Sequence, residues 1–251
     1  MKREIRIIPL REIPLIKVGD DLPALFLAAL DRLEEEVRVG DILVVSHSIV
    51  SVAEGRVFRI DAIEPSKRAI DIACKTNRDA AVVELALREA TKVIREEPVL
   101  ITQTKQGIIT DYSGIDASNA PAGYLIALPI DPDASAMRMH KAISKILGFS
   151  LPVIIADTQG RPWRKGAVNF AIGIAGMSPF TDNAGRTDLF GRELRSSLVC
   201  TADEIASASE LVMGQSDAAI PAVIVRGVSI STEPKETASR IIRGPDSSLF
   251  E

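Results

Sequence analysis

Two short strings of polar residues in this sequence could carry chemistry. Asp116, Ser118 and Asn119 lie close together in a turn that follows a predicted strand. Asp157 and Thr158 directly follow an apolar run that reads as another strand. Carboxylate and hydroxyl oxygens are the ligands that hard divalent cations prefer, so these residues indicate a metal-dependent enzyme that uses phosphates. Each string alone also fits a structural role, as a turn that satisfies its own backbone or as a helix cap.

Positively charged residues follow the second string. Arg161, Arg164 and Lys165 come soon after Asp157, and three cations near a carboxylate suit a polyphosphate or another multiply charged anion. A solvated loop with ordinary charges is the alternative. A further polar segment, residues 213–217, follows a predicted helix that a glycine ends, which leaves its amides free to face a ligand. Many helices end in this way, so this segment alone is a weak signal.

Common nucleotide- and metal-binding patterns are absent from the sequence. It has no Gly-x-x-x-x-Gly-Lys-Ser/Thr loop, and residues 173–176 form only half of a dinucleotide-binding loop. His47 and His140 are the only two histidines, too few for a histidine-rich zinc site, and no serine lies in a Gly-x-Ser-x-Gly elbow. Phosphate chemistry in this chain would therefore depend on carboxylates and hydroxyl groups that hold metal ions.

The composition excludes several classes of function. The 251 residues carry a formal net charge of -4, and 4% are aromatic, so neither a nucleic-acid surface nor a carbohydrate groove is expected. Charged residues interrupt every apolar run well before the roughly 20 residues needed to cross a bilayer, and no signal core follows the N-terminus. Cys74 and Cys200 are expected to be buried free thiols. We therefore expect a cytoplasmic protein with no membrane or nucleic-acid partner.

The apolar pattern predicts interspersed strands and helices. Short apolar runs rich in β-branched residues predict strands, and apolar residues three and four apart predict amphipathic helices. The predicted strands are 5–8, 42–45, 99–102, 107–110, 153–156 and 222–225. The predicted helices run from 22 to about 37, from 65 towards 74, from 80 to about 94, from 134 to 147, and from 201, with a capping box, to 213.

These elements predict a mixed α/β architecture of the α+β class, with no Rossmann or P-loop unit. Residues 1–230 are expected to form one catalytic domain, and residues 231–251 a polar and loosely attached tail. The segment 167–176 is too apolar and too small-sided for an exposed loop. It fits close backbone packing, either inside one chain or between two.

Together the strings resemble the coenzyme F420-0:L-glutamate ligase family, which attaches glutamate through γ-linked amide bonds to a deazaflavin coenzyme precursor. The resemblance runs from roughly residue 13 to residue 227, nearly the whole chain short of its tail. Its order and spacing are too specific for a chance match. The matching elements are residues 14–17, 53–56, 114–119, 128–133, 157–158, 160–164, 190–194, 213–214 and 225–227.

The resemblance implies a GTP-dependent homodimer, with Mn²⁺ or Mg²⁺ and potassium as a further candidate ion, that acts on F420-0 or a related acid and L-glutamate. Asp116 and Asp157 would hold one metal ion, and Arg164 would join them as a catalytic residue. Thr158 and Gln215 would help to hold a second metal ion. The residues implied to lie along the nucleotide are Ile13, Pro14, Leu15, Ile16, His47, Ser48, Asn119, Met213, Gly214, Gln215, Ser216, Asp217, Ala218, Ala219 and Ile220.

The implied chemistry explains why so few histidines suffice. Hydroxide is a poor leaving group, so a carboxylate does not react readily with an amine. Transfer of the γ-phosphoryl group of GTP to the carboxylate forms an acyl phosphate, which the amino group of glutamate can attack. Metal ions that bridge the phosphate oxygens neutralise charge, and little other covalent work is needed from the protein.

The chain departs from the family's pattern at four places. Val52 stands where a lysine near the nucleotide is usual, and His47-Ser48 where small hydroxyl or polar pairs are usual. Tyr112 replaces a common asparagine, and Gln215 takes a position that can be glutamate. These changes leave two alternatives open: the same ligase chemistry on another carboxylate acceptor such as a folate, or a catalytically silent relative that only binds nucleotide.

Overall fold

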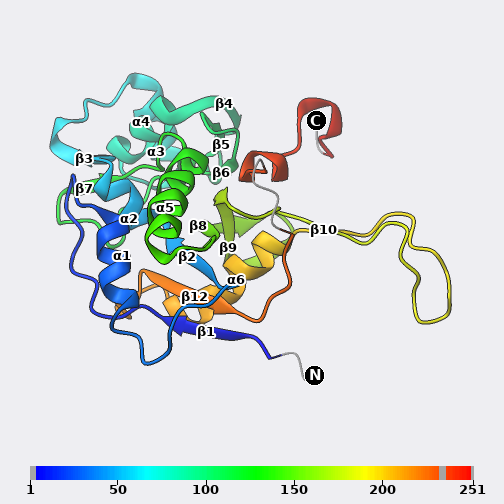
Figure 1. Cartoon of the computed structure of the whole chain (residues 1–251). Coiled ribbons are helices and arrows are strands. Elements are labelled where there is room, and N and C mark those ends of the chain that lie inside the picture. The colour runs from blue at the N-terminus through cyan, green and yellow to red at the C-terminus, as the bar shows by residue number, and fades with distance from the viewer. Residues whose placement is uncertain (1–3, 232–235, 250–251) are drawn as a thin grey trace.

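A five-stranded sheet forms the centre of the computed structural model, which describes residues 4–231 and 236–249 (Figure 1). β2 and β8 are parallel, and the other neighbouring pairs are antiparallel. The central strands are apolar on both faces, so both sides of the sheet need cover. The strands, in spatial order, are β1 (Arg6–Pro9), β12 (Ala222–Arg226), β2 (Ile42–Ser46), β8 (Val153–Arg161) and β9 (Arg164–Ala175).

Helices cover the two faces of this sheet. Successive side chains of a strand point to opposite faces, so Leu43 and Val45 of β2 join the core under two helices while Ile42 and Val44 join the core on the other face. Phe26 is fully buried in the first of these cores. The helices are α1 (Leu22–Leu30) and α5 (Pro132–Leu147) on the first face, and α6 (Thr201–Met213) on the second.

A smaller lobe is inserted between β2 and β8. Parallel neighbours need a crossover connection, and this lobe together with α5 provides it. The lobe has its own core, which includes Leu100 and Tyr112. Its elements are α2 (His47–Ala53), β3 (Val57–Arg59), a 3-10 turn (Ile60–Ala62), α3 (Lys67–Thr76), α4 (Ala80–Glu89), β4 (Ala90–Arg95), β5 (Ile101–Thr104), β6 (Ile109–Asp111), a 3-10 turn (Tyr112–Gly114) and β7 (Tyr124–Ile126).

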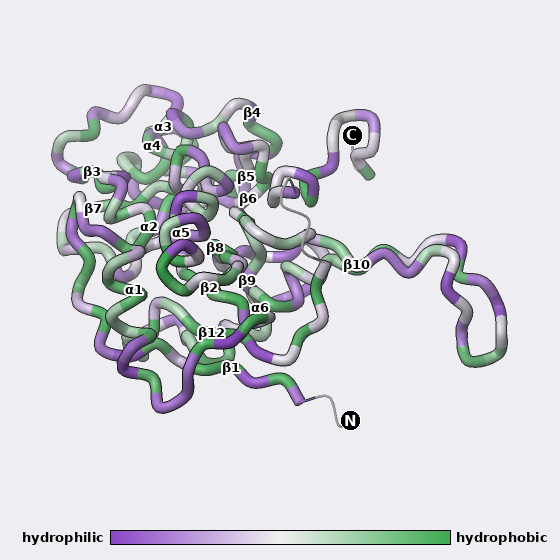
Figure 2. The backbone as a smooth tube through the Cα atoms, viewed as in Figure 1, coloured by the Kyte–Doolittle hydropathy of each residue, from purple (hydrophilic) through white to green (hydrophobic). Residues whose placement is uncertain are grey.

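A two-stranded arm projects from the body (Figure 1). It starts as the pair β10 (Thr181–Asp182) and β11 (Leu198–Val199) and continues through backbone hydrogen bonds up to Asp188 N and Arg192 O. Figure 2 shows that the arm is mostly hydrophilic and turns hydrophobic at its far end. Leu189 at the tip is completely exposed.

The predicted α+β class is confirmed, and most predicted elements exist near their predicted positions. α5 begins behind Asp131, whose carboxylate accepts from Ala134 N, and ends at Gly148 with a positive φ of 77°. This is the expected pairing of a polar N-cap with a glycine C-cap.

Several predicted boundaries were wrong because tertiary pairing overrides local pattern. The first helix ends at Leu30 rather than near 37, because Glu35 is drawn into ion pairs with Arg6 and Arg226. The helix predicted to reach 94 ends at Glu89, because the next six residues, rich in β-branched side chains, pair with β5. The strands predicted at 99–102 and 107–110 correspond to the pair β5 and β6, and the strand predicted at 222–225 extends to residue 226.

The predicted capping box at the start of α6 does not form. The N-cap is Cys200, with no side-chain cap bond, and Thr201 Oγ1 instead lies 2.6 Å from Thr181 Oγ1. Leu211, expected on the buried stripe, is 87% exposed. The helix predicted from Pro65 starts two residues later, behind the N-cap Ser66.

The apolar segment 167–176 is explained within one chain. Its second half belongs to β9 and lies in the core, with Ile174 fully buried. A Cβ atom on Gly173 would lie 2.4 Å from Pro132 O, so the small side chain allows α5 to approach the sheet. The first half also belongs to β9, and there Ala167 is exposed, Val168 and Phe170 are half-buried, and Asn169 is buried. The burial of this segment therefore needs no second chain.

The predicted tail is partly attached. Residues 232–235 and 250–251 lie outside the described residues, and the rest includes 3-10 turns at Ala238–Ile241 and Pro245–Ser247. Ala238 is 3% exposed, and its N–H donates to Asp133 Oδ1. Both cysteines are free thiols, but Cys74 is exposed, contrary to expectation. None of the helices among the described residues has the length and apolar character to cross a membrane.

Candidate active site

One edge of the sheet gathers the chemistry-bearing segments. β2 pairs with β8 only as far as Ser46 opposite Ala156, so β8 continues past the carboxyl end of β2, paired there with β9, and carries Asp157. The segment that enters β12 reaches the same edge, because Ser46 N donates to Pro221 O at 2.9 Å. Asp157 therefore lies inside a long strand rather than after it, yet still where parallel pairing ends, a common location for functional groups.

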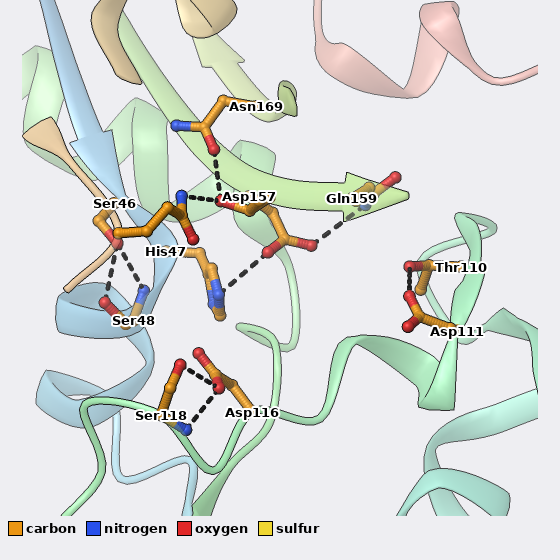
Figure 3. A network of polar contacts seen from close by, with 12 residues as sticks. Ser46, His47, Ser48, Thr110, Asp111, Asp116, Ser118, Asp157, Gln159 and Asn169 are labelled. Atoms are coloured by element: carbon orange, nitrogen blue, oxygen red, sulfur yellow. Dashed lines mark hydrogen bonds and ion pairs between the residues drawn. The ribbon is translucent and has the colours of Figure 1, made fainter. Parts of the chain in front are cut away.

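Asp157 is buried and held from two sides (Figure 3). His47 Nε2 lies 3.1 Å from Asp157 Oδ1, and Gln159 Nε2 donates to Asp157 Oδ2 at 3.1 Å. His47 is the first residue of α2, directly after β2. The parallel register of β2 and β8 thus places the imidazole beside the carboxylate.

The Asp157 carboxylate raises the pKa of His47. Burial alone lowers the pKa of His47, because it disfavours the charged imidazolium. The charge of Asp157 and its hydrogen bond act in the opposite direction, Asp116 adds to them, and the pKa of His47 is raised above 6.5. Within residues 4–231 and 236–249, His47 Nδ1 is buried without a hydrogen-bond partner.

Asp116 reaches the same region from a different part of the chain. Its backbone exchanges hydrogen bonds with Ile126, at 2.9 and 2.8 Å, which anchors the loop beside β7. Its Oδ1 accepts from both the N–H and the hydroxyl of Ser118 at 2.6 Å, so the predicted turn is also present. Figure 3 shows Asp116 and Asp157 on either side of the His47 ring.

Asp116 and Asp157 are the two carboxylates of this region that could hold a divalent cation, because carboxylate oxygens are ligands of hard cations. Mg²⁺ in phosphate-using sites commonly takes one or two carboxylates and leaves its other positions to phosphate and water. In the part of the chain that the structure describes, no three or more His, Cys, Asp or Glu side chains are grouped as a metal cluster. Two carboxylates are within the number that such a site takes from the protein.

Thr158 and Gln215 meet in a closed ring of hydrogen bonds. The Thr158 hydroxyl donates to Asn169 Oδ1 at 2.6 Å, and Asn169 Nδ2 donates to Glu210 Oε2 at 2.6 Å. Gln215 Nε2 donates to Thr158 Oγ1 at 2.7 Å and also to Glu210 Oε1. The amide nitrogen of Gln215, rather than its oxygen, therefore faces the threonine. This arrangement does not fit a second divalent cation between Thr158 and Gln215, because an N–H group cannot be its ligand.

The segments expected along the nucleotide flank this edge. The loop of residues 13–16 follows β1, and Pro14 and Leu15 line a shallow cavity of about 330 Å³ together with the start of α1. Residues 213–220 run from the end of α6 past Gln215 towards β12, and all but Met213 and Ile220 are exposed. The two segments lie near each other because β1 and β12 are antiparallel neighbours. Ser48 lies at the start of α2, and Asn119 is exposed on the Asp116 loop.

Arg164 is not brought to Asp157 within one chain. Asp157 is paired with Phe170, and Arg164 lies six residues before Phe170 on β9, which at about 3.3 Å per residue is roughly 20 Å. Arg161 is occupied by the carbonyl oxygens of Lys165 and Gly166 at the hairpin end.

Two departures from the family pattern, Tyr112 and Val52, lie away from the contacts of Asp157 described above. Tyr112 is 6% exposed in the core of the smaller lobe, and the Arg78 guanidinium lies 5.2 Å from its ring centre. Tyr112 is therefore a packing residue. Val52 is half-buried on α2, the helix that begins with His47. The neighbouring charges of Glu54 and Arg56 form structural ion pairs with Arg138 and Glu89.

Three side chains of this site were not predicted from the sequence: Gln159, Asn169 and Glu210. Asn169 lies in the segment 167–176, which was singled out only for its apolar, small-sided character. In strand register Asn169 lies opposite Thr158, and Glu210 is one turn before the glycine that ends α6. The hairpin pairing of β8 with β9 was the signal that could have placed Asn169.

A larger cavity lies next to Asp157. It has a volume of about 370 Å³, and its apolar wall includes Ile109, Phe170, Ile172 and Ile241. Gln159 lines it and also donates to Asp157 Oδ2. One side chain therefore separates this apolar space from the buried carboxylate.

Comparison with known proteins identifies the family. A family model described as F420-0:Gamma-glutamyl ligase matches residues 11–227. The coenzyme F420:L-glutamate ligase of Methanothermobacter thermautotrophicus is 43% identical over 224 residues, 89% of each chain. That of Methanopyrus kandleri is 44% identical over 239 residues, 94% of this chain and 93% of the relative. That of Archaeoglobus fulgidus is 42% identical over 229 residues, 91% and 90% of the two chains. The chain therefore belongs to the F420-0:gamma-glutamyl ligase family, as its motifs predicted.

Proposed function

We propose that this protein is a GTP- and metal-dependent ligase that joins L-glutamate to F420-0 through a γ-glutamyl amide bond. The observation that supports it most is that Asp116 and Asp157, from distant segments, lie on either side of the His47 ring, at the start of α2 directly after β2. The relatives that match over about nine tenths of the chain carry the name of this activity. The cytoplasm is the compartment that we propose for it.

In this proposal Asp116 and Asp157 hold one Mn²⁺ or Mg²⁺ ion. When bound, the ion neutralises charge on the phosphates of the nucleotide. His47 and Gln159 fix the two oxygens of Asp157 and so orient it. Such second contacts to a metal-binding carboxylate are as much part of a site as the ligand itself.

The reaction proceeds in two steps. An oxygen of the acceptor carboxylate attacks the γ-phosphorus of GTP, the bond to the β-phosphate oxygen breaks, and GDP leaves. The amino group of glutamate then attacks the carbonyl carbon of the acyl phosphate, inorganic phosphate leaves, and the amine loses its proton. The protein needs to position the partners and exclude water.

We place the planar part of the acceptor in the 370 Å³ cavity beside Gln159. Apolar walls with few polar groups are typical of sites for aromatic small molecules. The acceptor carboxylate would then point past Gln159 towards Asp157. Phe170→Ala should raise the KM for the acceptor more than the KM for GTP, and equal effects on both would contradict this placement.

We also propose that the protein is a homodimer held together through the arm. A two-stranded ribbon is marginally stable alone, and Leu189 and Phe190 at its tip are 101% and 89% exposed. A partner chain that covers this tip would stabilise it. Arg164 and Arg192, remote from Asp157 in their own chain, would then serve the neighbouring site.

A product assay tests the proposed function against its alternatives. The purified protein is incubated with GTP, Mn²⁺ and L-glutamate, and with either F420-0 or a folate, and product masses are measured. We expect F420-0 to gain the mass of one glutamyl residue, which is glutamate less one water, with release of GDP and inorganic phosphate. Glutamate added only to the folate would indicate the other acceptor, and nucleotide binding without any product would indicate a silent relative. Asp157→Asn is the negative control.

A further inference from the structure

The ring of Thr158, Asn169, Glu210 and Gln215 has a definite polarity. Both oxygens of the Glu210 carboxylate accept from amide nitrogens, one from Asn169 and one from Gln215. A carboxylate oxygen accepts hydrogen bonds and, when ionised, cannot donate. The group of Gln215 that faces Glu210 must therefore be its NH2, and the amide oxygen must point elsewhere.

The same NH2 group also satisfies Thr158. It has two protons, and its two partners, Thr158 Oγ1 and Glu210 Oε1, come from β8 and α6. The Thr158 hydroxyl donates a hydrogen bond to Asn169 Oδ1, and Asn169 is 3% exposed. The ring is thus complete, and the partial positive charge of an amide lies between a hydroxyl oxygen and a carboxylate.

From this geometry we propose that the Gln215 amide replaces a second metal ion, so that the chain holds a single divalent cation per active site, at Asp116 and Asp157. The oxygens of Thr158 and Glu210 can be bridged either by a divalent cation or by the NH2 group of Gln215. The two are alternatives, because each presents positive charge to the same oxygens. Gln215 is then a positioning residue. It links β8 to the end of α6 and holds the segment 213–220 at the sheet edge. The predicted number of bound ions depends on the proposed function in one respect: a nucleotide supplies the remaining ligands of the ion.

The test counts ions in matched variants. Native mass spectrometry of the protein with Mn²⁺ and a slowly hydrolysed GTP analogue should show one ion per chain in the wild type. Gln215→Glu keeps the shape but places a second carboxylate beside Glu210, and the repulsion should be relieved by a second bound ion. Combining Gln215→Glu with Glu210→Gln should return the count to one.

A thermal scan supplies a readout that does not depend on mass spectrometry. Without metal, Gln215→Glu should have a lower Tm than the wild type, and Mn²⁺ should restore it by more than it stabilises the wild type. Two ions in the wild type, or one ion and no extra Mn²⁺ effect in Gln215→Glu, would overturn the inference. A wild type that holds one ion but makes no ligation product would instead remove the proposed function and leave the ion count standing.

Discussion

At the scale of single residues, Asp157 connects three parts of the site. It makes one contact with His47, which follows β2, and accepts a hydrogen bond from Gln159 on its own strand. Asp116 lies on the other side of the His47 ring. A carboxylate that is both buried and held on two sides has one orientation. Its substitution should therefore remove charge without letting a neighbour take its place.

Asp157→Asn is expected to lower kcat/KM for ligation by at least about 100-fold. The amide has the same size but lacks the charge that holds the cation, and metal stabilisation of the transferring phosphate is worth several kcal/mol, at about 1.4 kcal/mol for each factor of ten. Steady-state assays at limiting Mn²⁺ measure the effect. Asp61→Asn, an exposed carboxylate in a surface ion pair, is the matched control. Near-normal turnover of Asp157→Asn would contradict the role.

Val52→Lys is expected to strengthen GTP binding. A charge-assisted contact to a phosphate contributes roughly 1.5–3 kcal/mol, about tenfold to one-hundredfold in Kd. Val52 lies on α2, the helix that starts with His47, and is only half-buried, so a longer side chain can be accommodated. Calorimetry with GTP measures the change, and Val52→Met controls for side-chain length. Unchanged binding would show that another cation already supplies the charge.

At the scale of the elements, Glu84 joins two helices of the smaller lobe. Its carboxylate accepts from Ser66 N, the N-cap of α3, at 2.9 Å and from Arg88 Nε at 2.8 Å. Partial burial raises the pKa of Glu84, but these contacts lower it more, so the pKa is held below 4.5. A carboxyl group with a depressed pKa stabilises the fold above its unfolded value, and this contribution is lost as the pH falls through the folded value.

Glu84→Gln is expected to lower the free energy of unfolding by about 1–2 kcal/mol at neutral pH. The difference from the wild type should shrink as the pH falls below 4.5, because the wild-type carboxylate then becomes protonated. Urea unfolding at neutral pH and at a pH below 4.5 measures this difference in the free energy of unfolding. Glu64→Gln, exposed on the same lobe, should change little at either pH. An equal loss from Glu84→Gln at both pH values would rule out the charged contacts as its source.

At the scale of the whole molecule, the arm is the segment whose exposed apolar tip one chain leaves uncovered. Backbone hydrogen bonds join its two strands to each other as far as Asp188 and Arg192, and its tip exposes two large apolar side chains. The buried half of residues 167–176, in contrast, packs inside the chain against α5. A dimer therefore has to be argued from the arm.

Replacing both Leu189 and Phe190 by Ser is expected to weaken the dimer by at least about 10²- to 10⁴-fold, since burial of each side chain contributes roughly 1.5–3 kcal/mol and both chains of the dimer lose them. Light scattering across a dilution series measures the mass. Leu211→Ser removes an equally exposed leucine on α6 and should leave the mass unchanged. A monomeric wild type at micromolar concentration would contradict the proposal.

Subunit exchange tests whether the site is shared. An Asp157→Asn chain and an Arg164→Ala chain are each expected to be inactive, and their mixture to regain up to about a quarter to a half of the wild-type activity. The gain arises because one site of each mixed dimer combines both intact residues. No recovery despite exchange proven by mass labels would place Arg164 outside the neighbouring site.

The sequence by itself determined much of this protein because local chemistry is readable in it. Apolar runs predicted four strands of the main sheet, β1, β2, β12 and the first part of β8, but not β9, and apolar residues three and four apart predicted helices near α1, α3, α4, α5 and α6. The order of the polar strings was enough to predict the family that the comparisons confirm. These signals depend on neighbours within a few residues, so no tertiary information was needed.

Only the tertiary structure decided which polar groups meet. His47 faces Asp157 because β2 and β8 are parallel in one particular register, and Asn169 faces Thr158 because β9 folds back along β8. Glu210 joins them only after α6 docks on the sheet. Such contacts depend on strand register and helix packing between residues far apart in the chain, where a shift of one residue would turn each side chain to the opposite face.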